Sequence, residues 1–182
     1  FVYLCTMTTL NNVKDLAIQL MNKTFKVNAK GWTYDLSALD LGYYFEFSNK
    51  KLAFGTCNYV KKEISLSKPL CEVNLDKIDT QITDTILHEI AHAFCVHIYG
   101  TKDGRGHDWR WKSIAKQIGC NGERCYDIDD VNHTQSKYTY ICKHCKRETP
   151  RHKKPKRTQA CGNAVNNTTL VDLATIMYWN YE

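Results

Sequence analysis

Apolar side chains recur at helical intervals in two long stretches of the chain. In residues 9–24 they fall three or four positions apart, with polar residues between them, which predicts a helix with one buried face. A second apolar stripe begins after Pro69 and predicts a helix that ends near Gly100. A shorter helical pattern spans residues 108–118, and Gly119 follows it in the position of a C-terminal cap.

Between the two long helices the pattern is typical of strands. Short runs of β-branched and aromatic residues, separated by Gly, Asn and Ser, occupy residues 32–34, 43–47 and 63–66. These runs predict about three strands in one small sheet. The order helix, small sheet, helix, loop, helix places the domain in the α+β class.

The composition changes in the last third of the chain. Beyond Tyr126 the sequence becomes polar, and a basic segment that carries cysteines begins at Lys137. A chain of 182 residues is long enough for one domain with its own core and a small added module. We therefore expect a main domain over residues 7–130, a small module over 137–164, and a tail over 165–182 in which apolar residues at helical intervals predict a short helix.

Two features of composition limit the location of the chain. No apolar run approaches the roughly 18 residues that a membrane-spanning helix needs. Nine cysteines, an odd number spread along the chain, fit a disulfide framework poorly and favour metal ligands where they cluster. We expect an intracellular protein, cytoplasmic or, in a eukaryote, nuclear, with no membrane partner, and we assume a monomer.

The second long helix contains the motif His88-Glu89-Ile90-Ala91-His92. Residues four apart on a helix lie on one face, so both imidazoles can reach a single Zn²⁺ ion. Glu89 is adjacent to the first ligand, close enough to move a proton from a water on the metal to a leaving amine. His107, after a loop that contains glycines, is a candidate third ligand. Three protein ligands with one open position are typical of a catalytic zinc site.

With these motifs the chain resembles the SprT-like metalloproteases. The resemblance covers about residues 9–161 and rests on the HExxH motif, on Gly106-His107 with Trp109 and Trp111 after it, and on the segment 57–67. It implies a zincin-like metalloprotease domain in which His107 is the third ligand of the catalytic zinc. It also implies cleavage of proteins that are associated with DNA or crosslinked to it.

The basic segment resembles the zinc ribbon with which members of that family often end. Cys142 and Cys145 form a CxxC knuckle and Cys161 follows, but Ala164 stands where a fourth cysteine is expected. His152 is the best placed residue to complete a Cys₃His site for a second, structural zinc. The alternative is a degenerate ribbon that binds metal weakly or not at all.

The charge of the chain is concentrated in this segment. Residues 137–157 hold nine Lys or Arg and one acid, a net charge of +8, whereas the whole chain carries +6. Interleaved with Tyr138 and Tyr140, these cations favour contact with the phosphates and bases of single-stranded or non-specific DNA, although a solvated face is the alternative. The expected contacts are Lys143, Lys146, Arg147, Arg151, Lys153, Lys154, Lys156 and Arg157.

The sequence thus predicts a zinc metalloendopeptidase whose substrates are proteins on DNA. The competing interpretation is a nucleic-acid-binding zinc protein with a vestigial peptidase site. A protease that does not use DNA is a third interpretation. Zinc content and an assay for cleavage stimulated by DNA would distinguish the three.

Overall fold

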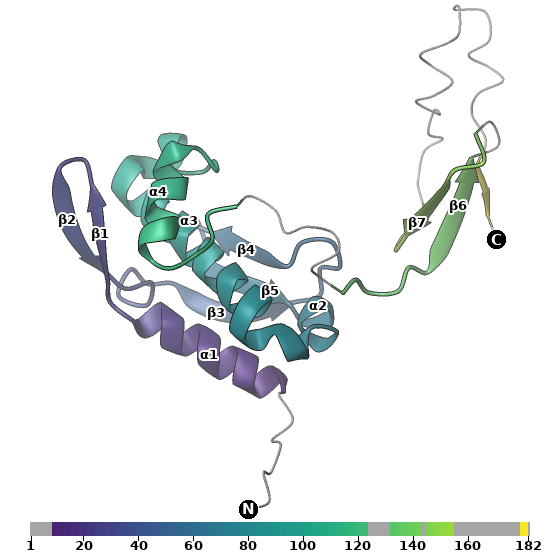
Figure 1. The fold of residues 1–182 in the computed structure, drawn as a ribbon, viewed down its shortest axis with the longest axis horizontal. Coiled ribbons are helices and arrows are strands. Elements are labelled where there is room, and N and C mark those ends of the chain that lie inside the picture. Colours follow the sequence, from purple (N-terminus) through teal and green to yellow (C-terminus); the bar gives the residue numbers. More distant parts are fainter. Residues whose placement is uncertain (1–8, 124–131, 143–144, 155–178, 182) are drawn as a thin grey trace, which may run out of the picture. The chain divides into compact units, whose positions relative to one another are not determined.

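The chain divides into two compact units, residues 1–134 and 135–182. The structure, a computed structural model, describes residues 9–123, 132–142, 145–154 and 179–181 (Figure 1). Among the described residues, none of the helices has the length and apolar character that crossing a membrane requires.

The first unit opens with helix α1 (Leu10–Asn22), which confirms the helix predicted over residues 9–24. Its buried face consists of Val13, Ala17 and Met21, which lie one turn apart along the helix. Asn12 accepts hydrogen bonds from the Thr9 backbone and hydroxyl, so the start of the helix is capped.

A two-stranded hairpin follows α1. Strands β1 (Phe25–Ala29) and β2 (Trp32–Leu36) pair antiparallel, and the sequence pattern indicated only the second. Lys30 and Gly31 form the turn, both with positive φ (52° and 78°), which is the backbone geometry that suits the twist of a two-residue hairpin. Gly31 adopts this conformation without the steric penalty that a side chain would bring.

A three-stranded sheet completes the β structure of this unit. Strands β3 (Tyr44–Ser48), β4 (Gly55–Asn58) and β5 (Glu63–Ser67) are ordered β3-β5-β4, with β5 parallel to β3 and antiparallel to β4. Central strand β5 is buried over residues 64–67. The sequence analysis missed β4, because Gly-Thr-Cys-Asn lacks the apolar alternation that marks a strand.

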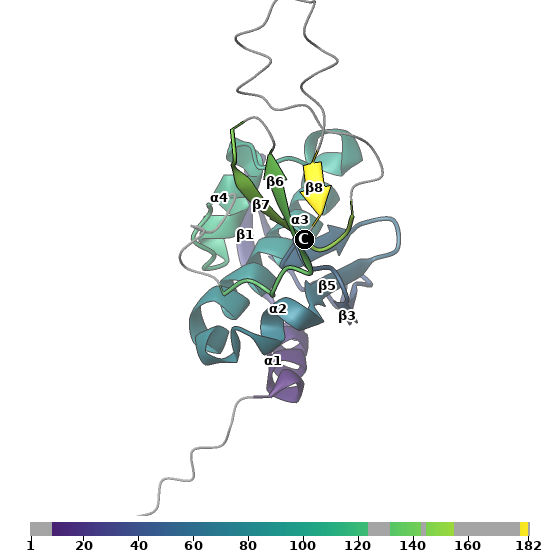
Figure 2. The same ribbon diagram turned by 90° about the vertical axis from the view of Figure 1, so that its right-hand side faces the viewer.

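Helices cover one side of this sheet. After short helix α2 (Lys68–Glu72) come a 3₁₀ turn (Leu75–Lys77) and a π turn (Ile78–Ile82), and these lead into the long helix α3 (Thr83–Asp103). Figures 1 and 2 show α1 and α3 on the same side of the sheet. The core between them is apolar, with Ile64, Leu66, Ile86, Ile90 and Phe94 among its fully buried side chains.

The end of α3 combines a predicted and an unexpected feature. Gly100 has non-helical angles (φ 79°, ψ 169°), so the regular helix breaks where the sequence predicted its end, and a further turn runs to Asp103. Helix α4 (Trp109–Gln117) then begins at its N-cap residue Asp108 and is followed by Gly119 at φ 95°, as predicted.

The second unit is a small antiparallel sheet. Its strands are β6 (Tyr138–Cys142), β7 (Glu148–Arg151) and β8 (Trp179–Tyr181), ordered β7-β6-β8. Strand β6 includes the strand-like run that the sequence indicated at 138–141. The helix predicted in the tail spans residues 168–179, of which only Trp179 lies within the described residues, and it begins β8.

Candidate metal centre

Three imidazoles from two parts of the first unit converge on one point. Helix α3 presents His88 and His92 one turn apart, and the loop before α4 brings His107 to them. The Nε2 atom of His107 lies 2.9 Å from that of His88 and 3.0 Å from that of His92. One ligand atom from each of the three residues lies within 4.8 Å of the others, so the three residues could hold one metal ion.

The chemistry of this donor set fits zinc. Nitrogen ligands about 2.0–2.1 Å from a tetrahedral zinc ion are separated by roughly 3.3 Å, close to the spacing of these atoms. Burial, followed by the neighbouring imidazoles, lowers the pKa of His88 to about 4 and that of His92 to about 3. Because a metal ligand must be a neutral imidazole, both side chains are in the binding form at neutral pH.

The Glu89 side chain lies against strand β4. It is only 7% exposed, and a Cβ atom added to Gly55 would fall 2.7 Å from its Oε1 atom. The backbone N–H of Cys57 donates to its carboxylate. Burial raises the pKa of Glu89 to about 8, against the opposite effects of Lys50 and of this hydrogen bond. The carboxylate is therefore held in a fixed place, and its burial favours the protonated form at neutral pH.

Cys57 belongs to the surroundings of this site. Burial, followed by the negative charge of Glu89, raises the pKa of its thiol to about 12. A thiol with such a pKa stays protonated at neutral pH, and metals bind the thiolate. We therefore assign Cys57 to the support of Glu89 through its backbone.

Trp111 forms the floor under the three imidazoles, a role that the sequence analysis did not assign. It is 1% exposed, and its ring centroid lies 4.5 Å from that of His88, 5.3 Å from that of His92 and 4.6 Å from that of His107. Its position four residues after His107 was the signal available in the sequence. The indole restricts how the imidazoles can tilt.

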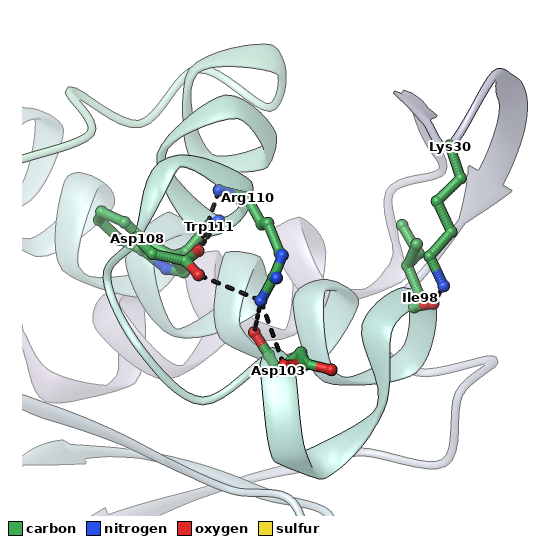
Figure 3. Close-up of polar contacts among 6 residues, drawn as sticks. All are labelled: Lys30, Ile98, Asp103, Asp108, Arg110 and Trp111. Atoms are coloured by element: carbon green, nitrogen blue, oxygen red, sulfur yellow. Dashed lines mark hydrogen bonds and ion pairs between the residues drawn. The ribbon is translucent and has the colours of Figure 1, made fainter.

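The loop that carries His107 is fixed at both ends by Arg110. Figure 3 shows this side chain between Asp103, at the end of α3, and Asp108, at the start of α4. Its Nη1 atom donates to the Asp103 backbone carbonyl at 3.0 Å and lies 3.2 Å from the Asp108 carboxylate. The Asp108 carboxylate also accepts from the backbone N–H groups of Arg110 and Trp111, as an N-cap does. The ends of both helices are thereby held together.

The predicted ribbon ligands are only partly described. Cys161 and the side chain of Cys142 lie outside the described residues, whereas Cys145 and His152 are both half-buried. The Cys₃His site therefore stays a prediction. Among the expected DNA contacts, Lys143, Lys156 and Arg157 also lie outside it, and the others are exposed: Lys146, Arg147, Arg151, Lys153 and Lys154.

The α+β fold and the three convergent histidines are those of a metallopeptidase-like domain. The SprT-like family model matches residues 18–139, about two thirds of the chain. The chain belongs to the SprT-like family, as the sequence motifs indicated. No curated protein and no solved structure gives a match to the chain.

Proposed function

We propose that this chain is a zinc-dependent metalloendopeptidase that cleaves proteins associated with DNA or crosslinked to it. The observation that carries the peptidase part is the convergence of His88, His92 and His107, with Glu89 buried beside the first of them. A structural zinc site takes four protein ligands, whereas three leave a position open for a reacting molecule.

The reaction divides between the ion and the protein. A zinc ion held by the three imidazoles would supply Lewis acidity, which would make a water more acidic and a carbonyl more electrophilic. Glu89 takes the proton from the water and delivers it to the leaving nitrogen. Burial raises the pKa of Glu89 to about 8, close to neutral pH, which suits a group that takes up a proton and then releases it.

The position of strand β4 favours a polypeptide as the substrate. It is an edge strand of the three-stranded sheet, paired only with β5 among the described strands, and it lies against Glu89 at Gly55. The outer edge of such a strand presents backbone N–H and C=O groups with which an extended peptide can pair. A peptide added there would run beside the carboxylate that acts on it.

The basic second unit supports the proposal that the substrates are proteins associated with DNA. Lys146, Arg147, Arg151 and Lys153 are exposed on or beside its sheet, and the Lys154 ammonium lies 5.5 Å from the centre of the Tyr138 ring. Exposed cations attract phosphates through release of counterions, whatever the base sequence. This unit would therefore concentrate the enzyme on DNA.

Glu89→Gln tests the mechanism. The variant keeps the size of the side chain but loses the base, so we expect one catalytic zinc per chain to remain while hydrolysis falls by at least about 10²–10⁴-fold. Glu72→Gln, on the exposed surface of α2, is the matched control and should keep full activity. The substrate should be a protein assayed free and bound to single-stranded DNA. Undiminished cleavage by Glu89→Gln would refute the proposed role.

The charge of the second unit also favours a second candidate, a nucleic-acid-binding zinc protein in which the peptidase site is vestigial. The same assay separates the two. Zinc bound at the three histidines, together with DNA binding and no cleavage of any DNA-bound protein by the wild-type chain, would favour the second candidate.

A further inference from the structure

A pocket beside the metal centre is lined by three aromatic side chains. Its volume is about 480 Å³, and it lies between the β1–β2 hairpin, the end of α3 and the start of α4. Trp32 contributes from the hairpin, Tyr99 from α3 and Trp109 from α4. We call these three side chains with their surroundings the aromatic pocket.

The walls of the aromatic pocket are fixed by hydrogen bonds that reach across the fold. The Lys30 ammonium, at the tip of the hairpin, donates to the Ile98 carbonyl at 2.7 Å (Figure 3). This carbonyl lies in the last regular turn of α3 before Gly100. Carbonyls in a last helical turn lose their regular partners, so a lysine is a favourable substitute. The same ammonium lies 4.9 Å from the centre of the Tyr99 ring.

The other side of the hairpin is fixed to α4. The Gln117 side chain accepts from the Asn28 backbone N–H at 2.7 Å and donates to the Asn28 carbonyl at 3.2 Å. Two such bonds to one residue set the position of β1 against the helix. The hairpin is thus attached to both helices, and the pocket between them is built into the fold.

Folding alone does not account for the two indoles in this pocket. Trp32 is 72% exposed and Trp109 is 68% exposed, although their neighbours hold fixed positions. Tryptophan buries a large apolar area when it is covered and is enriched where proteins bind partners. Two exposed indoles on the walls of one fixed pocket indicate a bound group that covers them.

The aromatic pocket lies on the same side of α3 as the metal ligands. Tyr99 follows His92 by seven residues, which is two helical turns and about 10 Å along the axis. Trp109 follows His107 by two residues. An extended peptide rises about 3.3 Å per residue, so roughly three residues would cover the distance from the metal centre to the pocket.

Charge favours an apolar occupant over a phosphate. Sixteen Lys or Arg and sixteen Asp or Glu precede residue 137, so this part of the chain has no net charge. Among the described residues that line the pocket, Lys30 is the charged one, and its ammonium already bonds to Ile98. The Arg110 guanidinium lies 5.6 Å from the centres of the Tyr99 and Trp109 rings, but its charge is paired with Asp103 and Asp108. A nucleic acid would need several cations here, whereas an uncharged side chain needs none.

We infer that the aromatic pocket binds a large apolar side chain, an aromatic one best, of the polypeptide substrate about three residues from the bond that is cleaved. This inference rests on the proposed peptidase function. Trp32 and Trp109 would determine specificity, since they touch a substrate side chain remote from the reacting atoms.

The test is a peptide series in which one position at a time, up to four residues on either side of the cleaved bond, is changed from Ala to Phe. With the zinc-loaded full chain, we expect Phe at one position about three residues away to raise kcat/KM by about tenfold or more. Trp32→Ala and Trp109→Ala should each remove most of that preference, measured for each variant as the ratio of its kcat/KM on the Phe peptide to its kcat/KM on the all-Ala peptide. Tyr44→Ala, which removes an exposed aromatic ring from β3, is the control and should keep the preference.

A binding measurement separates failure of the pocket from failure of the peptidase. In a Glu89→Gln background, the preferred Phe peptide should bind at least about tenfold more weakly when Trp32 is also replaced by Ala. If replacement of Trp32 weakened peptide binding but the wild-type chain cleaved no peptide, the proposed role of the aromatic pocket would stand and the proposed peptidase function would be refuted. If neither Trp replacement changed the cleavage preference or the peptide binding, the proposal that the aromatic pocket binds a substrate side chain would be refuted. Trp32→Ala that weakens binding of a (dT)₁₂ oligonucleotide but leaves the peptide preference intact would overturn it in favour of a base-stacking site.

Discussion

The two units of this chain differ in where the evidence for function lies. In the first unit, the net charge up to residue 136 is zero, and the evidence is placement: three imidazoles from α3 and the following loop meet within 4.8 Å. In the second unit, the evidence is the charge of +8 over residues 137–157, on a small sheet with exposed cations. Bond cleavage requires atoms within a few tenths of an ångström of one arrangement, whereas attraction of phosphates requires only cations near a surface.

This contrast determines how each unit should respond to mutation. Side chains around the metal centre act together, so a single replacement there should have a large effect. Cations in the second unit act nearly independently, so single replacements should have small and similar effects. The predictions below follow that order.

The largest effect is expected from loss of a metal ligand. His107→Ala leaves His88 and His92 with only two protein ligands, so the chain should lose one equivalent of zinc and essentially all hydrolysis, measured by elemental analysis after dialysis and by kcat/KM. His97→Ala, an exposed histidine on the same helix, is the control and should keep both. Unchanged zinc content in His107→Ala would show that the convergence of the three imidazoles does not define the zinc site.

A methyl group at Gly55 should have the next largest effect. The added carbon of Gly55→Ala falls 2.7 Å from Glu89 Oε1 and 2.8 Å from Thr85 Cγ2, so these side chains or the elements that carry them must shift. Overpacking of this kind costs about 1–3 kcal/mol in the free energy of unfolding, and a displaced carboxylate should lower kcat/KM at least tenfold.

Gly106→Ala is the matched control for that replacement, because the nearest atom to its added carbon is 3.9 Å away, although His107 is adjacent. Urea unfolding and peptide hydrolysis of both variants provide the comparison. Equal effects of the two replacements would contradict the close approach of β4 to Glu89.

The sequence predicted the chemistry of the site better than its surroundings. His88, Glu89 and His92 could be assigned because helical spacing fixes which residues share a face. His107 needed the family resemblance, since a loop of unknown path separates it from α3. The approach of Gly55 to Glu89 depends on β4, whose four residues carry no apolar alternation, and long-range packing of this kind leaves no periodic signal in a sequence.

Acid should lower the free energy of unfolding of the first unit when the protein is free of metal. The pKa values of His88 and His92 lie near 4 and 3 in the folded chain, below the 6.5 of the unfolded chain, so the unfolded state takes up protons first. The stabilisation is complete above about pH 6.5 and is lost as the pH falls towards 4, by roughly 1–3 kcal/mol. Thermal unfolding of the chelator-treated protein between pH 7.5 and 4.5 measures it. A melting temperature that is flat between pH 6.5 and 4.5 would show that these histidines do not lose protons on burial.

The smallest effect is expected from single cations of the second unit, and it tests the other side of the comparison. Lys146→Ala removes one exposed charge, so affinity for a (dT)₁₂ oligonucleotide should fall only a few-fold, and the slope of log K against log salt concentration should become shallower by about 0.7, as for one phosphate contact on a single strand. Lys14→Ala removes the same charge from the exposed face of α1, where the surrounding net charge is zero, and should leave both the affinity and the slope unchanged. Fluorescence anisotropy at four salt concentrations measures both quantities. If the two replacements weakened binding equally, attraction would depend on the charge of the whole chain, and the second unit would have no special role in binding DNA.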